Sequence, residues 1–184
     1  MVRYCRAMGG QSWIFGYGSL VWRPAFPYVE RRPGSIRGFA RRLWQRSTDH
    51  RGTPQDPGRV ATLIEAEGAI CGGMGYRVKA DVLTEVLANL DQREQNGYRR
   101  IVTRLFFQGE AASPVNALVY VAGPDNPHYA GPAPIEEIAA IARRCRGPSG
   151  DNRAYVLELA RALAELELRD PHVEEVAQRL EKGS

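Results

Sequence analysis

The sequence has few cysteines, few lysines and no long apolar run, and each shortage excludes a class of protein. The three cysteines, Cys5, Cys71 and Cys145, lie far apart and form no CxxC pair. This argues against a disulfide framework and a structural zinc site, and it fits the reducing cytoplasm where we expect the protein to act. No stretch approaches the run of about 18 apolar residues that a membrane-spanning helix needs, so we expect no membrane association.

Lysine is nearly absent, so arginine carries almost all of the positive charge. Lys79 and Lys182 are the only lysines, and the net charge is +4. The guanidinium fork suits carboxylates and phosphates, which leaves several partners open. One basic cluster could face nucleic acid, but its aromatic neighbours form no stacking platform, and we expect no nucleic-acid partner. The cluster comprises Arg31, Arg32, Arg37, Arg41 and Arg42. His128 and His172 have no partner at metal-ligand spacing, so we expect no metal.

The length and composition suit one soluble domain. The chain has 184 residues, of which 43% are hydrophobic and 25% charged, enough for a sizeable core. Residues 1–12 lack the apolar stretch of a secretory signal, and we expect them to be an N-terminal extension before a single domain over residues 13–182. Strands come first, one helix interrupts them, and helices follow. This order predicts an α+β fold with a curled, mainly antiparallel sheet or small barrel that carries helices on one side.

Apolar periodicity and turn residues predict where the elements lie. We expect strands over residues 13–15, 36–45, 59–65, 70–78, 99–107 and 115–121, with a bulge at Gly38 and a hairpin turn at residues 66–68. The proline-containing stretch of residues 21–34 reads as an irregular loop. Helices are expected over residues 81–95, 135–146, 153–168 and 171–182, with Asn152 as the N-cap of the third.

One carboxylate continues the apolar stripe of the first predicted helix. Glu94 lies four residues after Leu90 and seven after Leu87, which places it on the face that the core should cover. Burial raises the pKa of a carboxyl group, and a raised pKa suits a general acid/base. If the helix ends before residue 94, Glu94 is a surface acid instead. The pattern alone leaves both interpretations open.

A glycine turn, Gly16-Tyr17-Gly18-Ser19-Leu20, follows the first predicted strand. Two glycines allow successive N–H groups to face outward, and such a nest binds anions, including carboxylates. The turn lacks the third glycine of a dinucleotide motif and the Gly-Lys-Ser/Thr of a P-loop. It is also not a Gly-x-Ser-x-Gly nucleophile turn. A tight turn that merely begins a loop is the alternative.

The polar segment of residues 47–52 places Asp49 beside His50. Adjacent side chains seldom reach the geometry of a catalytic dyad, and no nucleophile is implied. We therefore interpret this segment as a surface turn or a loop ordered by its own polar groups.

Short motifs recur along the chain: residues 15–20 with Trp22, residues 44–45 with 47–52, residues 57–60, residues 90–91 with 93–94 and 97–99, residues 125–127 with Tyr129 and 131–134, and residues 147–150 with Asn152 and Tyr155. Taken together, these motifs resemble the ChaC family of γ-glutamylcyclotransferases, in its glutathione-specific branch. They follow the family order over residues 13–168, and two differences stand out. Arg46 occupies a position where a small residue is expected, which would alter the rim of the pocket. The N-terminal extension is also longer than in minimal members.

The resemblance implies a compact fold on a small barrel and cleavage of glutathione to 5-oxoproline and cysteinylglycine without a cofactor. In this reaction the α-amine of the substrate attacks its own γ-carbonyl, so no protein nucleophile is needed. The family's catalytic glutamate corresponds to Glu94, which would move the protons. Oxyanion donors are expected from the glycine turn, with Tyr120 or Tyr129 as additions. The family's substrate-binding loop corresponds to Ile14, Phe15, Gly16, Tyr17, Gly18, Ser19 and Leu20.

Two other functions remain open beside this one. The substrate could be another γ-glutamyl compound, such as a γ-glutamyl amine or amino acid. Alternatively, the domain could bind a γ-glutamyl ligand, or regulate cation transport, without catalysis. In each enzymatic case the partner is a small molecule, and we expect a monomer or a homodimer.

Overall fold

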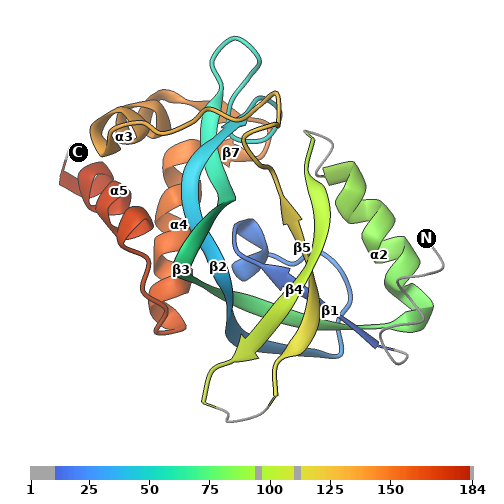
Figure 1. Cartoon of the computed structure of the whole chain (residues 1–184). Helices are drawn as coiled ribbons and strands as arrows, with labels where there is room; N and C mark the ends of the chain where they lie inside the picture. Colours follow the sequence, from blue (N-terminus) through green and yellow to red (C-terminus); the bar gives the residue numbers. More distant parts are fainter. Residues whose placement is uncertain (1–10, 94–96, 110–112, 183–184) are drawn as a thin grey trace.

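Five strands close into a barrel in this computed structural model, which describes residues 11–93, 97–109 and 113–182. Around the barrel the order is β1-β3-β2-β4-β5, and β1 and β5 are parallel whereas the other neighbours are antiparallel. The expected α+β barrel is confirmed (Figure 1). The strands are β1 (Gln11–Gly16), β2 (Glu30–Ser47), β3 (Gly58–Lys79), β4 (Arg99–Phe107) and β5 (Val115–Val121).

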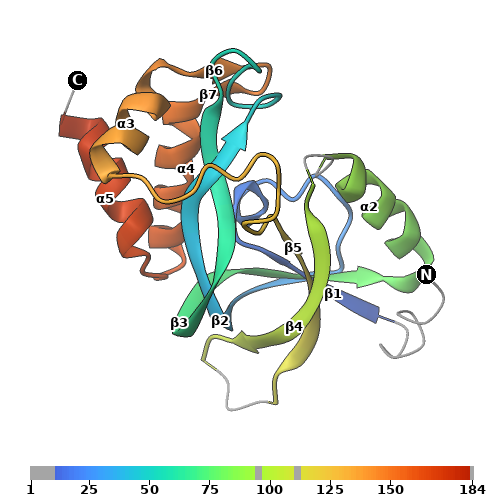
Figure 2. The same ribbon diagram turned by 45° about the horizontal axis from the view of Figure 1, so that its top comes forward.

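The helices cover the barrel unequally. Three of them, α3 (Ile135–Arg144), α4 (Asn152–Glu165) and α5 (Pro171–Lys182), pack together on one side, as expected. Across the barrel, α2 (Ala80–Arg93) adds a cover that the sequence-based expectation did not place there (Figures 1 and 2). Short elements, η1 (Ser19–Val21), β6 (Arg146–Gly147) and β7 (Gly150–Asp151), complete the fold.

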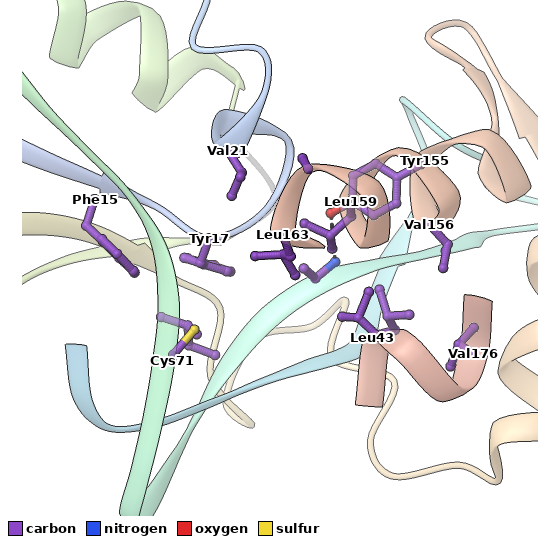
Figure 3. Close-up of a cluster of buried hydrophobic side chains, with 14 of the residues drawn as sticks. Phe15, Tyr17, Val21, Leu43, Cys71, Tyr155, Val156, Leu159, Leu163 and Val176 are labelled. Carbon is purple, nitrogen blue, oxygen red and sulfur yellow. Dashed lines mark hydrogen bonds between the residues drawn. The ribbon is translucent and has the colours of Figure 1, made fainter. Parts of the chain in front are cut away.

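Each helical cover buries its own apolar cluster. Against α2 the cluster contains Leu83, Val86 and Leu90, which confirms the apolar stripe predicted for this helix. The larger cluster joins the barrel interior to α3, α4 and α5, and Figure 3 shows side chains of α4 directed towards the segment that carries Tyr17 and Val21. The barrel core therefore packs directly against the turn that follows β1.

β3 is one strand of 22 residues, not two strands joined by a hairpin. Arg37 pairs with Ile70, and Phe39 pairs with Glu65, so both halves of β3 pair with β2. The hairpin turn expected between the halves is wrong, because its residues form a register shift opposite Gly38 while the chain keeps its direction. Gly38 itself adopts a φ of +80°, which confirms the predicted bulge.

Other boundaries differ from the expectations in two informative ways. β2 begins at Glu30, so the loop expected over residues 21–34 ends earlier, and Pro33 lies within the strand. Asn152 is not a helix cap: its Oδ1 accepts the N–H of Arg59 at 2.6 Å, and its Nδ2 donates to the Arg59 carbonyl at 2.7 Å. A buried amide that satisfies both backbone groups of one strand residue fastens α4 to β3.

Candidate active site

A pocket of about 360 Å³ lies at the end of the barrel where β1, β2 and β5 finish and β3 and β4 begin. Because neighbouring strands alternate in direction, except for β1 and β5, these five ends meet. Their contributions to the lining include Tyr17, Ser47, Ala61, Tyr98 and Tyr120. The volume falls in the range typical of small-molecule sites, roughly 300–1,000 Å³.

Most of the predicted substrate-binding residues meet in this pocket. Ile14, Gly16 and Tyr129 are not part of its lining: Ile14 is buried against α2, Gly16 lies in the β1–β3 ladder, and Tyr129 forms an isolated bridge with Gln45. The predicted residues that do line the pocket are Phe15, Tyr17, Gly18, Ser19, Leu20 and Tyr120.

Glu94, the predicted general acid/base, lies outside the described residues. The described chain resumes at Gly97, and Tyr98, which follows it, lines the pocket. On the other flank, Leu90 is buried in the cluster under α2. The segment that contains Glu94 thus connects the end of α2 to a strand that begins at the pocket.

The turn after β1 is tight enough to require glycine. A Cβ added to Gly16 would lie 2.5 Å from the Cβ of Leu20, closer than real Cβ atoms approach. A Cβ on Gly18 would lie 3.2 Å from the hydroxyl oxygen of Tyr155, a contact that leaves little space. The two glycines therefore allow the chain to turn this closely against Leu20 and Tyr155 beside the pocket.

Three buried donors hold the turn from behind. Arg41 Nε donates to the Tyr17 carbonyl at 2.7 Å, and the Tyr76 hydroxyl donates to the Leu20 carbonyl at 2.6 Å. The Tyr17 hydroxyl in turn donates to the Tyr120 carbonyl at 2.7 Å. Burial raises the pKa of Tyr76 to about 12, so its hydroxyl stays a donor at physiological pH. These bonds fix the turn before any ligand arrives.

Arg41 is not a surface arginine, although it belongs to the basic cluster in the sequence. Its side chain forms a buried ion pair with Asp170 at 2.9 Å, and Asp170 Oδ1 also accepts the N–H of Val173 at the start of α5. Close by, His172 Nε2 accepts the N–H of Leu43 at 3.0 Å. Burial, with a contribution from the charge of Arg42, lowers the pKa of His172 to about 4 and keeps this imidazole neutral.

Tyr155, in the first turn of α4, forms part of the pocket wall that faces the glycine turn. Its buried hydroxyl accepts the N–H of Ala61 at 3.1 Å, and its ring lies 5.6 Å from that of Trp22. The guanidinium of Arg51 lies 5.5 Å from the centroid of the Tyr155 ring and donates to the Asp151 carbonyl at 3.2 Å. The sequence does not single out Tyr155 as a site residue, because a buried helical tyrosine is usually a core residue.

The opening of the pocket is basic. Arg23, Arg46, His50 and Arg51, the basic rim, line it together with Asp49. The polar segment expected to be only a surface or structural loop therefore contributes to the pocket. His50 Nδ1 lies 3.1 Å from Ser149 Oγ, and its Nε2 lies 3.7 Å from Asp49 Oδ2, both in exposed positions. A rim of this charge favours a ligand that carries carboxylates.

The hydroxyl of Tyr120, an expected oxyanion donor, points to α2. It lies 2.8 Å from Asp91 Oδ1 and 3.3 Å from the Leu87 carbonyl oxygen, and Asp91 also pairs with Arg100 at 3.1 Å. A hydroxyl group has a single hydrogen to donate. In this structure Tyr120 therefore links the pocket wall to the last turn of α2.

Within residues 11–93, 97–109 and 113–182, no three His, Cys, Asp or Glu side chains are grouped so that they could hold a metal ion. No helix in that part of the chain is long and apolar enough to cross a membrane.

Comparison with known proteins gives a consistent answer. The profile of the family described as ChaC-like protein matches residues 12–183. The chain is 43% identical to "Gamma-glutamylcyclotransferase 2-3" of Arabidopsis thaliana over 171 residues, which cover 90% of this chain and 86% of that protein. It is 47% identical to "Glutathione-specific gamma-glutamylcyclotransferase 1" of Homo sapiens over 150 residues, which cover 80% of this chain and 68% of that protein.

A solved structure shares the fold over nearly the whole length. The yeast γ-glutamyl cyclotransferase specific to glutathione superposes with a TM-score of 0.88 at 29% identity, covering 95% of this chain and 97% of that one. The family match spans most of the chain, and the regions aligned with the two relatives cover most of the length of each relative. The chain therefore belongs to the ChaC-like family, as the resemblance of its motifs indicated.

Proposed function

We propose that this protein is a glutathione-specific γ-glutamylcyclotransferase, a lyase that converts glutathione to 5-oxoproline and cysteinylglycine. One observation carries the proposal: in a member of the ChaC-like family, the glycine turn forms a wall of a pocket at the barrel end. The relatives named for this activity are similar to the chain over most of its length.

The fixed turn suits a reaction in which the substrate attacks itself. The α-amine must approach the γ-carbonyl within one γ-glutamyl group, and well-oriented intramolecular attack reaches effective molarities on the order of 10⁵ to 10⁸ M. A pocket wall held by Arg41, Tyr76 and the Tyr17 hydroxyl can impose that folded shape without rearranging. Gly18, Ser19 and Leu20 line the pocket, where they would bind the γ-glutamyl half.

The basic rim suits the charges of glutathione. Glutathione carries two carboxylates and one ammonium group at neutral pH. Arg23, Arg46 and Arg51 have no carboxylate within ion-pair distance among the described residues, so their charge is available to a ligand. The α-carboxylate would lie near the turn, and the carboxylate of the glycine end would lie nearer the rim.

Glu94 is proposed as the general acid/base, as its position in the family motif implies. It would accept a proton from the α-amine and return one to the leaving amine of cysteine, a contribution of about 10²- to 10⁴-fold. Tyr98, four residues further along the chain, lines the pocket and supports this placement. The scheme needs neither a protein nucleophile nor a cofactor.

A single domain over residues 13–182 agrees in extent with the family match over residues 12–183, and residues 1–12 would be an extension. We propose action in the cytoplasm, which suits the buried free thiols of Cys71 and Cys145. A monomer or a homodimer is expected, and light scattering of the purified chain distinguishes them.

The decisive experiment incubates the purified protein with millimolar glutathione and measures 5-oxoproline and cysteinylglycine by mass spectrometry. Glu94→Gln is assayed alongside, with Glu85→Gln, an exposed acid on α2, as the matched control. We expect product from the wild type and the control but none from folded Glu94→Gln. Product from all three would remove Glu94 from the mechanism, and product from none would overturn the proposed activity on glutathione.

A panel of γ-glutamyl substrates tests the second candidate. The name of the Arabidopsis thaliana relative specifies no glutathione, which keeps other γ-glutamyl amino acids and amines in consideration. We expect the wild type to prefer glutathione over these compounds by kcat/KM. A preference for another member of the panel would retain cyclotransfer and change the substrate.

A further inference from the structure

Arg41 lies outside the pocket lining but reaches the glycine turn from behind. Its side chain is 1% exposed, and it makes three kinds of contact. Nη1 pairs with Asp170 at 2.9 Å, Nη2 donates to the Gly72 carbonyl, and Nε donates to the Tyr17 carbonyl at 2.7 Å. Asp170, directly before α5, and Gly72, on β3, orient the guanidinium plane, so the third contact is presented to the turn in a fixed direction.

The contact with Tyr17 determines where the next N–H group points. In the described part of the chain every peptide bond is trans, so the Tyr17 carbonyl and the Gly18 N–H of the same plane point in opposite directions. The carbonyl points to Arg41, and none of Arg41, Gly72 and Asp170 lines the pocket, whereas Gly18 does. The Gly18 N–H therefore points away from Arg41, on the pocket side of the turn.

The Gly18 N–H also has no competing partner. Across the described ranges, no carbonyl or side-chain oxygen accepts a hydrogen bond from it. The Gly18 carbonyl, by contrast, accepts the N–H of Val21 at 2.9 Å, which closes η1. The turn thus satisfies its carbonyls within the protein and leaves this donor for a ligand.

We propose that Arg41 is a positioning residue that holds the Tyr17–Gly18 peptide so that the Gly18 N–H can donate to the γ-carbonyl oxygen of the substrate as it becomes an oxyanion. The inference rests on the proposed cyclotransfer. A charge-assisted bond on the carbonyl also polarises the peptide and strengthens its N–H as a donor. Loss of one oxyanion donor typically lowers kcat by about 10²- to 10³-fold.

Asp170 has a supporting part in this arrangement. Its carboxylate balances the buried guanidinium and simultaneously accepts the Val173 N–H at 3.1 Å. Because Arg41 is balanced by this charge, its effect on the turn is one of direction and local polarisation rather than of net field. The start of α5 is thereby connected to the pocket wall through one side chain.

The test compares Arg41→Lys with Asp170→Asn and a destabilised control. Lysine keeps the charge but cannot reach Asp170, Gly72 and Tyr17 in a fixed plane. We expect Arg41→Lys to lower kcat for glutathione by roughly 10- to 100-fold with KM within about threefold, because the donor acts mainly on the transition state. Asp170→Asn, which retains Arg41 and the acceptor for Val173, should lower kcat by several-fold.

Leu180→Ala is the control, since Leu180 is buried in α5 and does not line the pocket. It should lower thermal stability while kcat per folded molecule stays at the wild-type value. Unchanged kcat in Arg41→Lys would overturn the inference and leave only a structural role. Should Arg41→Lys not fold, Asp170→Asn replaces it in the test, and an unchanged kcat in Asp170→Asn would overturn the inference. No turnover by the wild type would overturn the proposed function, and the inference with it.

Discussion

The glycine turn and the basic rim line the same pocket, but the protein holds them in opposite ways. The turn is fixed by hydrogen bonds of Arg41, Tyr17 and Tyr76, all of them buried side chains. The rim is held by exposed contacts, such as His50 with Asp49, whose side chains are 48% and 44% exposed. One wall is rigid before binding, and the other can adjust.

The difference indicates that the glycine turn and the basic rim have different functions in the reaction. Truncating one partner of a buried hydrogen bond costs about 1–3 kcal/mol, whereas an exposed ion pair contributes roughly 0–1 kcal/mol. Only the rigid wall can supply donors that are already aimed at a developing charge. The adjustable wall suits attraction of a charged substrate. Changes to the turn should therefore lower kcat, and changes to the rim should mainly raise KM.

Gly16→Ala should give the largest effect, because it strikes the rigid wall at its tightest point. The added Cβ would lie 2.5 Å from the Leu20 Cβ, so the turn must move. A misplacement of about 1 Å can cost on the order of 10²-fold in rate, and we expect kcat/KM for glutathione to fall by about that factor. Steady-state kinetics on the folded variant provide the measurement.

Gly109→Ala is the matched control for Gly16→Ala. Gly109 has a φ of +76° and open space around it, and it does not line the pocket. Alanine there should cost about 1 kcal/mol of stability through backbone strain, with kcat/KM unchanged. Equal kinetic losses in both variants would contradict a special role for the turn.

The stability of the buried support behind the turn should depend on pH through His172. Its pKa is about 4 in the folded protein, below the ordinary value of 6.5, so the unfolded chain binds the proton more readily. The contribution of neutral His172 is complete above about pH 6.5 and is lost as the pH falls towards 4. Allowing for partial solvent screening, we expect a loss of about 2 kcal/mol.

Urea unfolding at pH 7 and pH 4.5 measures this loss in the wild type and in His172→Gln. Glutamine keeps an acceptor for the Leu43 N–H, which His172 Nε2 now accepts at 3.0 Å, but it does not titrate. Carboxylates titrate in both proteins, so the difference between them isolates the histidine. An identical decline in stability would contradict the assignment.

Tyr17→Phe should have a smaller effect on the same wall. The variant removes the hydrogen bond to the Tyr120 carbonyl and leaves that buried acceptor without this donor. We expect a loss of about 1–2 kcal/mol in the free energy of unfolding and a few-fold lower kcat. Tyr28→Phe, at a ring that is 40% exposed, should change neither. Indistinguishable stabilities of the two variants would mean that the turn does not depend on this bond.

The two walls also differ in how much of them the sequence predicts. The turn is predictable because its signal is local: two glycines directly after an apolar strand. Its support is not, because the partner of Arg41 is Asp170, 129 positions away, and no local pattern distinguishes Arg41 from the other arginines of the basic cluster, which are not buried. Asn152 is misjudged for the same reason, since its position suits a helix cap while its partner lies on β3.

The barrel itself shows the same limit. Alternating apolar residues predict β4, and an apolar run predicts β5, but the single strand β3 is expected as a hairpin because Gly68 is a good turn residue. Which neighbour a strand pairs with is decided by closure of the barrel, a property of all five strands together. Turn-forming residues such as Gly68 therefore do not predict how the barrel closes.

Arg46→Ala should have the smallest effect on activity, and it tests most directly whether the basic rim and the glycine turn have different functions. The Arg46 side chain is exposed, and its hydrogen bond is a weak one, 3.5 Å to the Tyr129 carbonyl, so stability should change by less than about 0.5 kcal/mol. With one positive charge fewer on the rim, KM for glutathione should rise roughly 2- to 5-fold at low salt while kcat stays constant. The difference should shrink in about 0.5 M salt, because screening weakens the attraction.

Arg104→Ala, which removes an exposed arginine of β4 outside the pocket lining, controls for the change in overall charge. If KM rises equally in both variants, the attraction comes from the net charge of the protein and not from the rim. If Arg46→Ala lowers kcat with KM unchanged, the adjustable wall takes part in the chemical step, and the division between the walls is wrong. A salt-sensitive rise in KM confined to Arg46→Ala would instead show that the rim attracts the substrate by its charge, while the glycine turn contributes to the chemical step.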